Sequence, residues 1–397
     1  MKRTLVLALS LAACKPSTPA EQYGFIATLG TDTVSAERVS RSPRRLVSDE
    51  VDRWPLVKQR HTEFDLTDDG QIARMVMDVR TPSGETPAKR GRRVTADFTK
   101  DSVMITITDS GGVTKRNFRT NGALAVPHVS MMYSVIELEV ASLLHHGAAT
   151  LAVGDSAAFR QFYPDRDVGP DFVLHSGWVS RRGGDSVVLR HDWLSGSGDV
   201  TIDSAGRMQT YSGMPSTYKV EVRRVAEAPD VAAIGERLAS AEKQRGAAQL
   251  SVRDTARGTI GAATLSVDYG RPLARGRTLL GNVIAYDRVW RTGANAATQF
   301  MTSAPITLGG VSLAAGTYTV WTVPHTNGAD LIVNSESGQW GTQYDGAKDL
   351  GKAKLTTETL PTPTEEFTIS IASSGAKRGT LVLEWGTFRW SAPIIVR

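Results

Sequence analysis

The chain has 397 residues, of which 41% are hydrophobic and 22% charged, and its formal net charge is +5. This length exceeds that of one typical domain, so we expect two domains, each with its own core. The balance of apolar and charged residues excludes a disordered chain and a polytopic membrane protein. The basic residues are spread among 41 acidic ones and form no stripe interleaved with aromatics, so no nucleic-acid partner is expected.

The N-terminus has the pattern of a bacterial secretory signal. Lys2 and Arg3 precede a short apolar run, and Leu11-Ala12-Ala13-Cys14 follows it directly. The run is too short to cross a bilayer as a stable helix. The last four residues resemble the lipobox of bacterial lipoproteins, in which the cysteine is acylated. The alternative is that Cys14 is simply a small residue near an ordinary cleavage site.

Cys14 is the only cysteine, which excludes a disulfide and a cysteine-ligated metal site. We therefore predict a signal peptide over 1–13, lipidation at Cys14 and a lipidated tether over 14–22. The anchor predicts a location in the cell envelope, periplasmic or at the outer membrane, with the membrane as partner. The sequence leaves the choice between inner and outer membrane open.

Residues 23–225 are predicted to form an antiparallel β domain. Alternating apolar and polar residues mark strands such as 71–79 and 102–108, and turn residues such as Asp68-Asp69-Gly70 separate the strands. One segment, near 130–146, has helical spacing and ends at Gly147, which predicts one amphipathic helix packed across the sheet. His145 and His146 fall in its last turn, where they complement the helix dipole.

Residues 226–254 are predicted to be a linker helix. The segment is rich in helix-forming residues, Asp230 follows a proline as its N-cap, and Gly246 ends it. Short strands with turn signals resume afterwards, so 255–397 is predicted to be a β-sandwich. The predicted fold class is mostly β, in two domains joined by the linker helix.

Six ordered motifs of the C-terminal domain resemble the bacterial family known as domain of unknown function 2911. They are Asp268-Tyr269-Gly270-Arg271-Pro272, Gly276-Arg277, Val289-Trp290-Arg291-Thr292-Gly293-Ala294-Asn295, Ala315-Gly316-Thr317-Tyr318, Gln339-Trp340-Gly341 and Leu383-Glu384-Trp385. The resemblance covers about residues 255–397 and implies a secreted, mostly β module with no established activity. The N-terminal region is only loosely similar to the half-barrel carriers and receptors of bacterial lipoprotein transport.

The stretch 286–298 concentrates polar and aromatic residues in one segment. Trp290, Arg291 and Asn295 combine an indole, a guanidinium and an amide, which are the groups that recognise sugars and carboxylates. We predict that they form a binding surface together with Trp321 and Arg271. The alternative is a buried polar network that only fixes the sandwich.

No catalytic residue is predicted, because the common hydrolase and nucleotide motifs are missing from the sequence. The carboxylates of Asp268 and Glu384 are the pair that a glycan hydrolase would need. The acidic turn 165–171 resembles the start of a calcium loop but lacks its final glutamate, and His175, His191 and Asp192 are a weak metal candidate. No metal and no cofactor are therefore expected.

The predicted function is a lipid-anchored, non-enzymatic binding or scaffolding module for a glycan or another envelope component. The alternatives are an envelope glycan hydrolase that uses carboxylates, and a carrier of lipid or another apolar ligand through the N-terminal sheet. The oligomeric state stays open.

Overall fold

The computed structural model describes residues 19–53, 56–84, 90–144, 151–164, 174–192, 196–245 and 250–397. Within these residues the fold is mostly β, with two sheets and two α-helices, which confirms the predicted fold class. The predicted signal peptide, Cys14, the pair His145 and His146, Gly147, the acidic turn 165–171 and Gly246 lie outside the described residues. No helix in the described ranges has the length and apolarity needed to cross a membrane.

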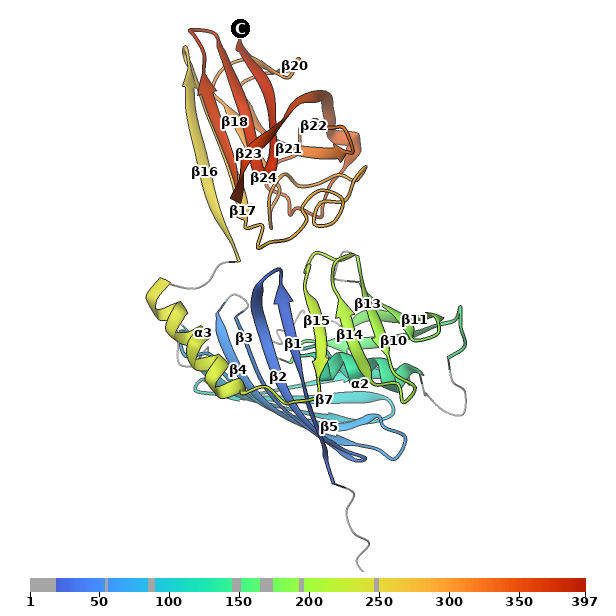
Figure 1. Ribbon diagram of the computed structural model, residues 1–397. Coiled ribbons are helices and arrows are strands. Elements are labelled where there is room, and N and C mark those ends of the chain that lie inside the picture. The colour runs from blue at the N-terminus through green and yellow to red at the C-terminus, as the bar shows by residue number, and fades with distance from the viewer. Residues whose placement is uncertain are drawn as a thin grey trace, which may run out of the picture.

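The N-terminal unit is one strongly curved sheet, in which fifteen described strands take part (Figure 1). Its strands are β1 (Glu21–Leu29), β2 (Asp32–Ser42), β3 (Arg45–Arg53), β4 (Val57–Leu66), β5 (Ile72–Arg80), β6 (Gly91–Phe98), β7 (Ser102–Asp109), β8 (Gly112–Arg119), β9 (Ala125–Pro127), β10 (Ser156–Phe162), β11 (His175–Gly183), β12 (Ser186–His191), β13 (Ser197–Ile202), β14 (Met208–Ser212) and β15 (Glu221–Val225).

Two antiparallel meanders, β1 to β8 and β10 to β15, join where β1 pairs with β15. Described turns contribute to these meanders, such as the one between β4 and β5 where the Gly70 amide donates to the Thr67 carbonyl, since a tight turn returns the chain antiparallel to itself. One pair departs from the antiparallel expectation: β9 runs parallel to β10. The chain between these two strands passes through a helix, and such a crossover is what a parallel pair requires.

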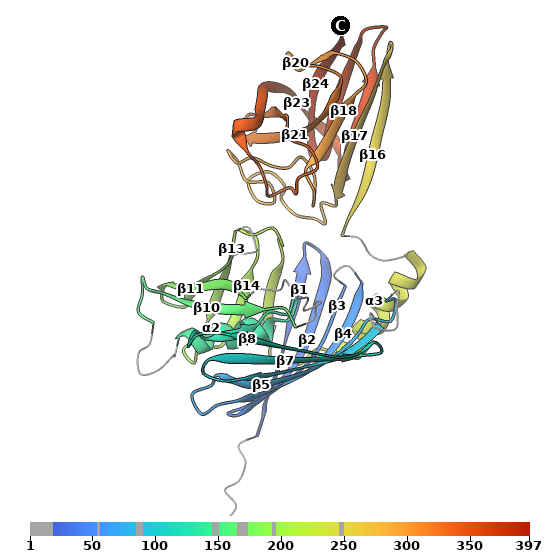
Figure 2. The ribbon, with the colours of Figure 1, turned by 180° about the vertical axis from the view of Figure 1, so that it is seen from behind.

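That helix, α2 (Tyr133–Leu144), lies on the inner side of the curved sheet (Figure 2). Eleven of its twelve residues are buried, so the prediction of an amphipathic helix was wrong. The sheet curves around the helix, and its side chains pack on the sheet core on nearly all sides. α2 therefore covers part of the inner face, which is the face that the alternative of an apolar-ligand carrier would use.

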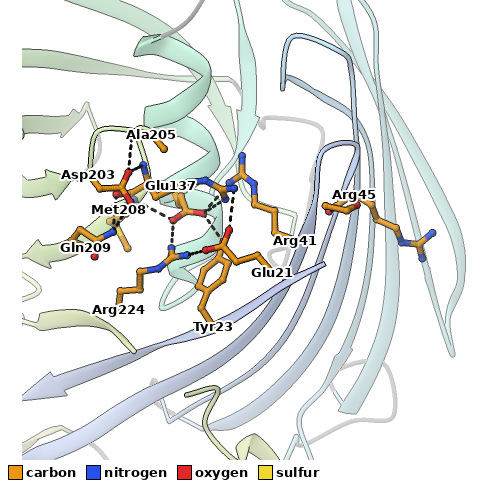
Figure 3. A network of polar contacts seen from close by, with 12 residues as sticks. Glu21, Tyr23, Arg41, Arg45, Glu137, Asp203, Ala205, Met208, Gln209 and Arg224 are labelled. Carbon is orange, nitrogen blue, oxygen red and sulfur yellow. Dashed lines mark hydrogen bonds and ion pairs between the residues drawn. The ribbon is translucent and has the colours of Figure 1, made fainter. Parts of the chain in front are cut away.

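Polar groups fix α2 at two points. The Glu37 carboxylate accepts hydrogen bonds from the amides of Tyr133 (2.7 Å) and Ser134 (3.0 Å) and so caps the helix N-terminus. One turn later, the fully buried Glu137 faces a group of arginines that come from the sheet (Figure 3). The helix is thus tied by charge to strands that are far from it in sequence.

The predicted linker helix is α3 (Val231–Arg245), and the Asp230 carboxylate caps it by accepting from the Ala233 amide at 3.0 Å. The helix packs on the outer face of β2 to β4, where Ile234 and Leu238 meet a small apolar cluster. The buried Glu242 accepts from the Val57 amide at 2.7 Å. α3 is therefore attached to the N-terminal sheet and does not swing freely between the two units.

The C-terminal unit is a folded sheet of nine described strands with the η1 turn (Gly346–Lys348). Its strands are β16 (Ser251–Ile260), β17 (Ala263–Pro272), β18 (Thr298–Thr302), β19 (Ile306–Leu308), β20 (Val311–Leu313), β21 (Gly316–His325), β22 (Gly328–Asn334), β23 (Asp349–Ser373) and β24 (Arg378–Val396). The pairing of the long strands β23 and β24 shifts twice, near Thr359 and Thr364, which lets the sheet turn back over β16 and β17. Across the layers, the Ile369 amide donates to the Tyr269 hydroxyl at 2.9 Å.

The two units meet at Arg275. Its carbonyl accepts from the Thr31 amide (3.0 Å), and its guanidinium donates to Asp32 (2.9 Å) and to the Leu250 carbonyl (3.1 Å). Gly30 has a φ of +63°, and a Cβ there would lie 2.1 Å from the Arg275 carbonyl oxygen. Only glycine permits this approach of the two backbones.

Candidate functional site

The segment 273–297 between β17 and β18 is irregular and carries the polar stretch predicted from the sequence. Trp290 is fixed within it by paired backbone bonds with Thr322 of β21, 2.7 Å and 2.9 Å long. The half-buried indole of Trp290 stacks on that of Trp385 at 6.0 Å and 14°, and meets the edge of Phe367 at 5.1 Å. The main chain and one flank of this tryptophan are therefore held rigidly.

After Trp290 the chain makes a tight turn with left-handed backbone at Thr292 (φ 53°) and Asn295 (φ 64°). Asparagine adopts this conformation readily, whereas threonine does so at a cost. The Thr298 hydroxyl donates to the Thr292 carbonyl at 2.7 Å and holds the turn closed. Gly270 makes room for it, since a Cβ at this position would lie 2.2 Å from the Ala294 carbonyl oxygen.

Arg291 lies along a second glycine. A Cβ on Gly341 would come within 2.3 Å of Arg291 Cδ, and the Gly341 amide donates to the Asn295 carbonyl at 3.1 Å. Arg291 Nη1 donates to the same carbonyl at 3.2 Å. Glycines from two motifs that are distant in sequence thus give this turn the space that it needs.

A groove of about 610 Å³ opens beside this turn, between the N-terminal and C-terminal units. The described residues that line it are Leu29, Thr217, Tyr218, Lys219, Leu250, Ser251, Pro272, Arg275, Arg277, Val283, Trp290, Arg291, Gly293, Ala294, Asn295, Trp340 and Trp385. The structure therefore brings Trp290, Arg291 and Asn295 together on one groove. Its size is within the range of small-molecule sites.

The charged side chains that line this groove are basic: Lys219, Arg275, Arg277 and Arg291 line it, and no described lining residue is acidic. Asp32 neutralises Arg275. The other three donate to backbone carbonyls, Lys219 to Met214 (2.6 Å) and Arg277 to Leu273 (2.6 Å) among them. Among the described residues, none of these three forms an ion pair with a carboxylate.

Burial lowers the pKa of all three of these basic groups. Burial, and then the charges of Arg291 and Arg277, lower the pKa of Lys219 below its ordinary value. Burial and the nearby Arg275 lower the pKa of Arg277 to about 10, although Glu365 and Asp32 oppose the shift. Burial also lowers the pKa of Arg291. The surroundings of these three groups therefore make their charged forms less favourable than in water.

Residues 251–394 match the model of the family described as "Protein of unknown function (DUF2911)". The predicted family resemblance is confirmed for the C-terminal unit. In sequence, the chain matches no curated protein. Among solved structures it is similar to a DUF1089 family protein from Pseudomonas aeruginosa, at 12% identity and a TM-score of 0.34, over 53% of this chain and 97% of that one. A similarity this distant carries no inference about function.

Among the groove residues that sequence reasoning missed are Lys219, Arg277, Trp340 and Trp385. Three of them stand in the ordered motifs of the DUF2911 domain, namely in Gly276-Arg277, in the Gln339 motif and in the Leu383 motif. That these motifs converge on one place was the signal that would have found them. Lys219 belongs to the N-terminal unit and had no sequence signal.

Trp321 does not belong to the contact surface, which corrects the prediction. Its side chain is 1% exposed and packs with Ala297, Ile332 and Tyr344 inside the DUF2911 domain. Its indole nitrogen donates to Thr319 Oγ1 at 3.0 Å. Both faces of β21 are buried at this point, so Trp321 supports the groove only from within.

Arg271 also lies apart from the groove. Its guanidinium forms ion pairs with Asp254 (3.0 Å) and Glu366 (2.8 Å), which join β16, β17 and β23. The structure gives Arg271 a bracing role, while its neighbour Pro272 lines the groove.

The two carboxylates considered for hydrolysis each form an ion pair with an arginine. Asp268 forms an ion pair with Arg253 at 2.9 Å, and Glu384 forms one with Arg389 at 2.5 Å. Neither acid lines the groove. The arrangement therefore offers no pair of free carboxylates facing a common substrate at this groove.

The two histidines of the metal candidate bond to different residues. His175 bonds to Asp192 at 3.0 Å, whereas the buried His191 turns its Nδ1 to Gln161 at 2.8 Å. Within the described ranges, no cluster of three or more histidine, cysteine, aspartate or glutamate side chains is placed to hold a metal ion.

Proposed function

We propose that this protein is a non-enzymatic binding module of the cell envelope, anchored by a lipid on Cys14, whose groove between the two β units binds a glycan. The observation that supports this most is the joint placement of Trp290, Trp340, Arg291 and Asn295 on one groove. Indole rings stack on sugar rings, and guanidinium and amide groups hydrogen-bond to sugar oxygens.

Trp340 is the residue whose removal tests the groove most cleanly. Its side chain is 51% exposed, so its truncation removes contact surface without opening the core. We expect Trp340→Ala to weaken binding to the best glycan of an oligosaccharide panel by at least about tenfold, which corresponds to about 1.4 kcal/mol.

The matched control is Trp178→Ala, which removes an indole of similar exposure, 40%, from β11 of the N-terminal sheet. Isothermal titration of both variants against the panel gives the comparison. If no glycan binds the wild-type protein, or if the two variants lose affinity equally, the groove is not a glycan site.

The anchor is tested separately by cell fractionation. The Cys14→Ala protein should leave the membrane fraction, because a lipidated cysteine is the attachment that the sequence predicts. Continued membrane attachment of this variant would contradict the anchor without bearing on the groove.

A further inference from the structure

The basic residues of the groove come from both β units. Lys219 belongs to the turn between β14 and β15, whereas Arg277 and Arg291 belong to the segment between β17 and β18. Bringing three partly buried positive charges together costs free energy. Glu365 and Asp32 offset this cost only in part, near Arg277, and no described carboxylate forms an ion pair with any of the three. A bound anion would remove this cost.

The backbone that lines the groove also has positive φ at three non-glycine positions. Seven described non-glycine residues have positive φ, and three of them line the groove: Lys219 (57°), Arg275 (51°) and Asn295 (64°). Such conformations persist where the surroundings enforce them, and they cluster at ligand sites. These conformations are an observation independent of charge. Lys219 is the one residue of the three that also belongs to the basic group without an ion pair, while Arg275 and Asn295 lie beside that group on the groove.

Several donors of these residues are still available for a ligand. Arg277 uses Nε and Nη2 for the carbonyls of Ala274 and Leu273, and Arg291 uses Nη1 for Asn295. Among the described residues, Nη1 of Arg277 and both Nε and Nη2 of Arg291 therefore have no hydrogen-bond acceptor. Guanidinium donors of this kind suit the paired oxygens of a carboxylate, phosphate or sulfate.

We propose that the glycan bound in this groove is acidic, and that its carboxylate, phosphate or sulfate group lies between Lys219, Arg277 and Arg291, in contact with both β units. This inference rests on the proposed function and names the ligand class. An acid group that contacts both units holds them together, so the ligand contributes to the contact between the units as Arg275 and Asp32 do.

The test uses pairs of oligosaccharides that differ only in charge. Trigalacturonic acid is compared with its methyl ester, and sulfated and phosphorylated oligosaccharides are compared with their desulfated and dephosphorylated forms. We expect the charged member of at least one pair to bind at least tenfold more tightly by titration calorimetry, with an affinity that falls as salt concentration rises. The pair that shows the preference identifies the acid group.

Substitutions of the basic residues show which of them bind the acid group of the ligand. Lys219→Met and Arg277→Met should each reduce the preference for the charged member, and Lys219→Arg should retain most of it. The control is Arg288→Met, which removes an exposed arginine of the same segment that does not line the groove. Equal loss in Arg288→Met would show a general charge effect and would overturn the assignment.

The remaining outcomes separate the two proposals. If neutral and charged members bind equally, the ligand is not acidic, while glycan binding stands. If inorganic phosphate or sulfate binds as tightly as any charged sugar, the anion site stands and glycan recognition fails. If no sugar and no anion binds, both proposals are overturned.

Discussion

The buried Glu137 of α2 permits the most quantitative prediction. Its side chain has no solvent exposure and accepts hydrogen bonds from the Tyr23 hydroxyl (2.5 Å), Arg41 (2.9 Å) and Arg224 (2.7 Å), with Arg207 at 3.4 Å. The Arg224 guanidinium also lies 3.4 Å above the Tyr23 ring (Figure 3). Glu137→Gln keeps the shape of the side chain, removes its negative charge and replaces one acceptor oxygen by a donor NH₂ group.

The expected loss follows from this geometry. The amide oxygen of the glutamine still accepts hydrogen bonds. The new NH₂ group, however, faces guanidinium donors, and the arginines lose the buried negative charge that compensates them. Removing one partner of a buried ion pair costs about 3–5 kcal/mol. We therefore expect Glu137→Gln to lower the free energy of unfolding of the N-terminal unit by about that amount.

Glu21→Gln is the matched control, because Glu21 pairs with the same Arg224 (2.5 Å) and Arg207 (3.1 Å) but its side chain is 46% exposed. Exposed pairs contribute up to about 1 kcal/mol. Urea unfolding, with hydrogen exchange of the α2 amides, measures both variants, and the unfolding of the C-terminal unit is the internal reference. If the two variants lose equal stability, burial does not govern the strength of this network.

Three further predictions concern other parts of the chain. Burial lowers the pKa of His191 to about 4, below the ordinary 6.5. Because the unfolded chain takes up this proton at a higher pH than the folded chain does, the free energy of unfolding should fall as pH falls from about 6.5 to about 4. His191→Phe should flatten that part of a stability-versus-pH curve. Gly270→Ala should destabilise the DUF2911 domain by about 1–3 kcal/mol in thermal unfolding and weaken ligand binding, because the new methyl group collides with the Ala294 carbonyl. Asp32→Asn removes the acid that pairs with Arg275 and should increase the radius of gyration in small-angle scattering, while the secondary structure measured by circular dichroism stays unchanged.

The sequence predicted local features well because they depend on local chemistry. The alternation in 102–108 is that of β7, Asp230 caps α3, and the helix expected near 130–146 is α2. The burial of α2 was not predictable in the same way. Its two glutamates, Glu137 and Glu139, resemble a polar face in the sequence, and only the curvature of the sheet puts both of them inside.

The candidate site was predictable only in part, for a similar reason. Trp290, Arg291 and Asn295 are close in sequence, so their common location follows from chain connectivity. Lys219 reaches the groove because β15 pairs with β1 and the two units meet at Arg275, and neither relation leaves a local pattern. Trp321 failed as a candidate because both faces of β21 are covered around it, and alternation along a strand does not reveal that.

The two interpretations of the stretch 286–298, a structural polar network and a ligand site, describe different atoms of the same turn. Its backbone is structural: Thr292 and Thr298 are fully buried, and their bond closes the turn against Gly270. Its side chains at Trp290, Arg291 and Asn295 point to the groove that the turn borders. This combination of a rigid backbone with side chains that face the groove suits a binding site, because a rigid backbone loses little conformational entropy when a ligand binds. Stability and recognition therefore depend on the same turn, so a variant such as Gly270→Ala should impair both.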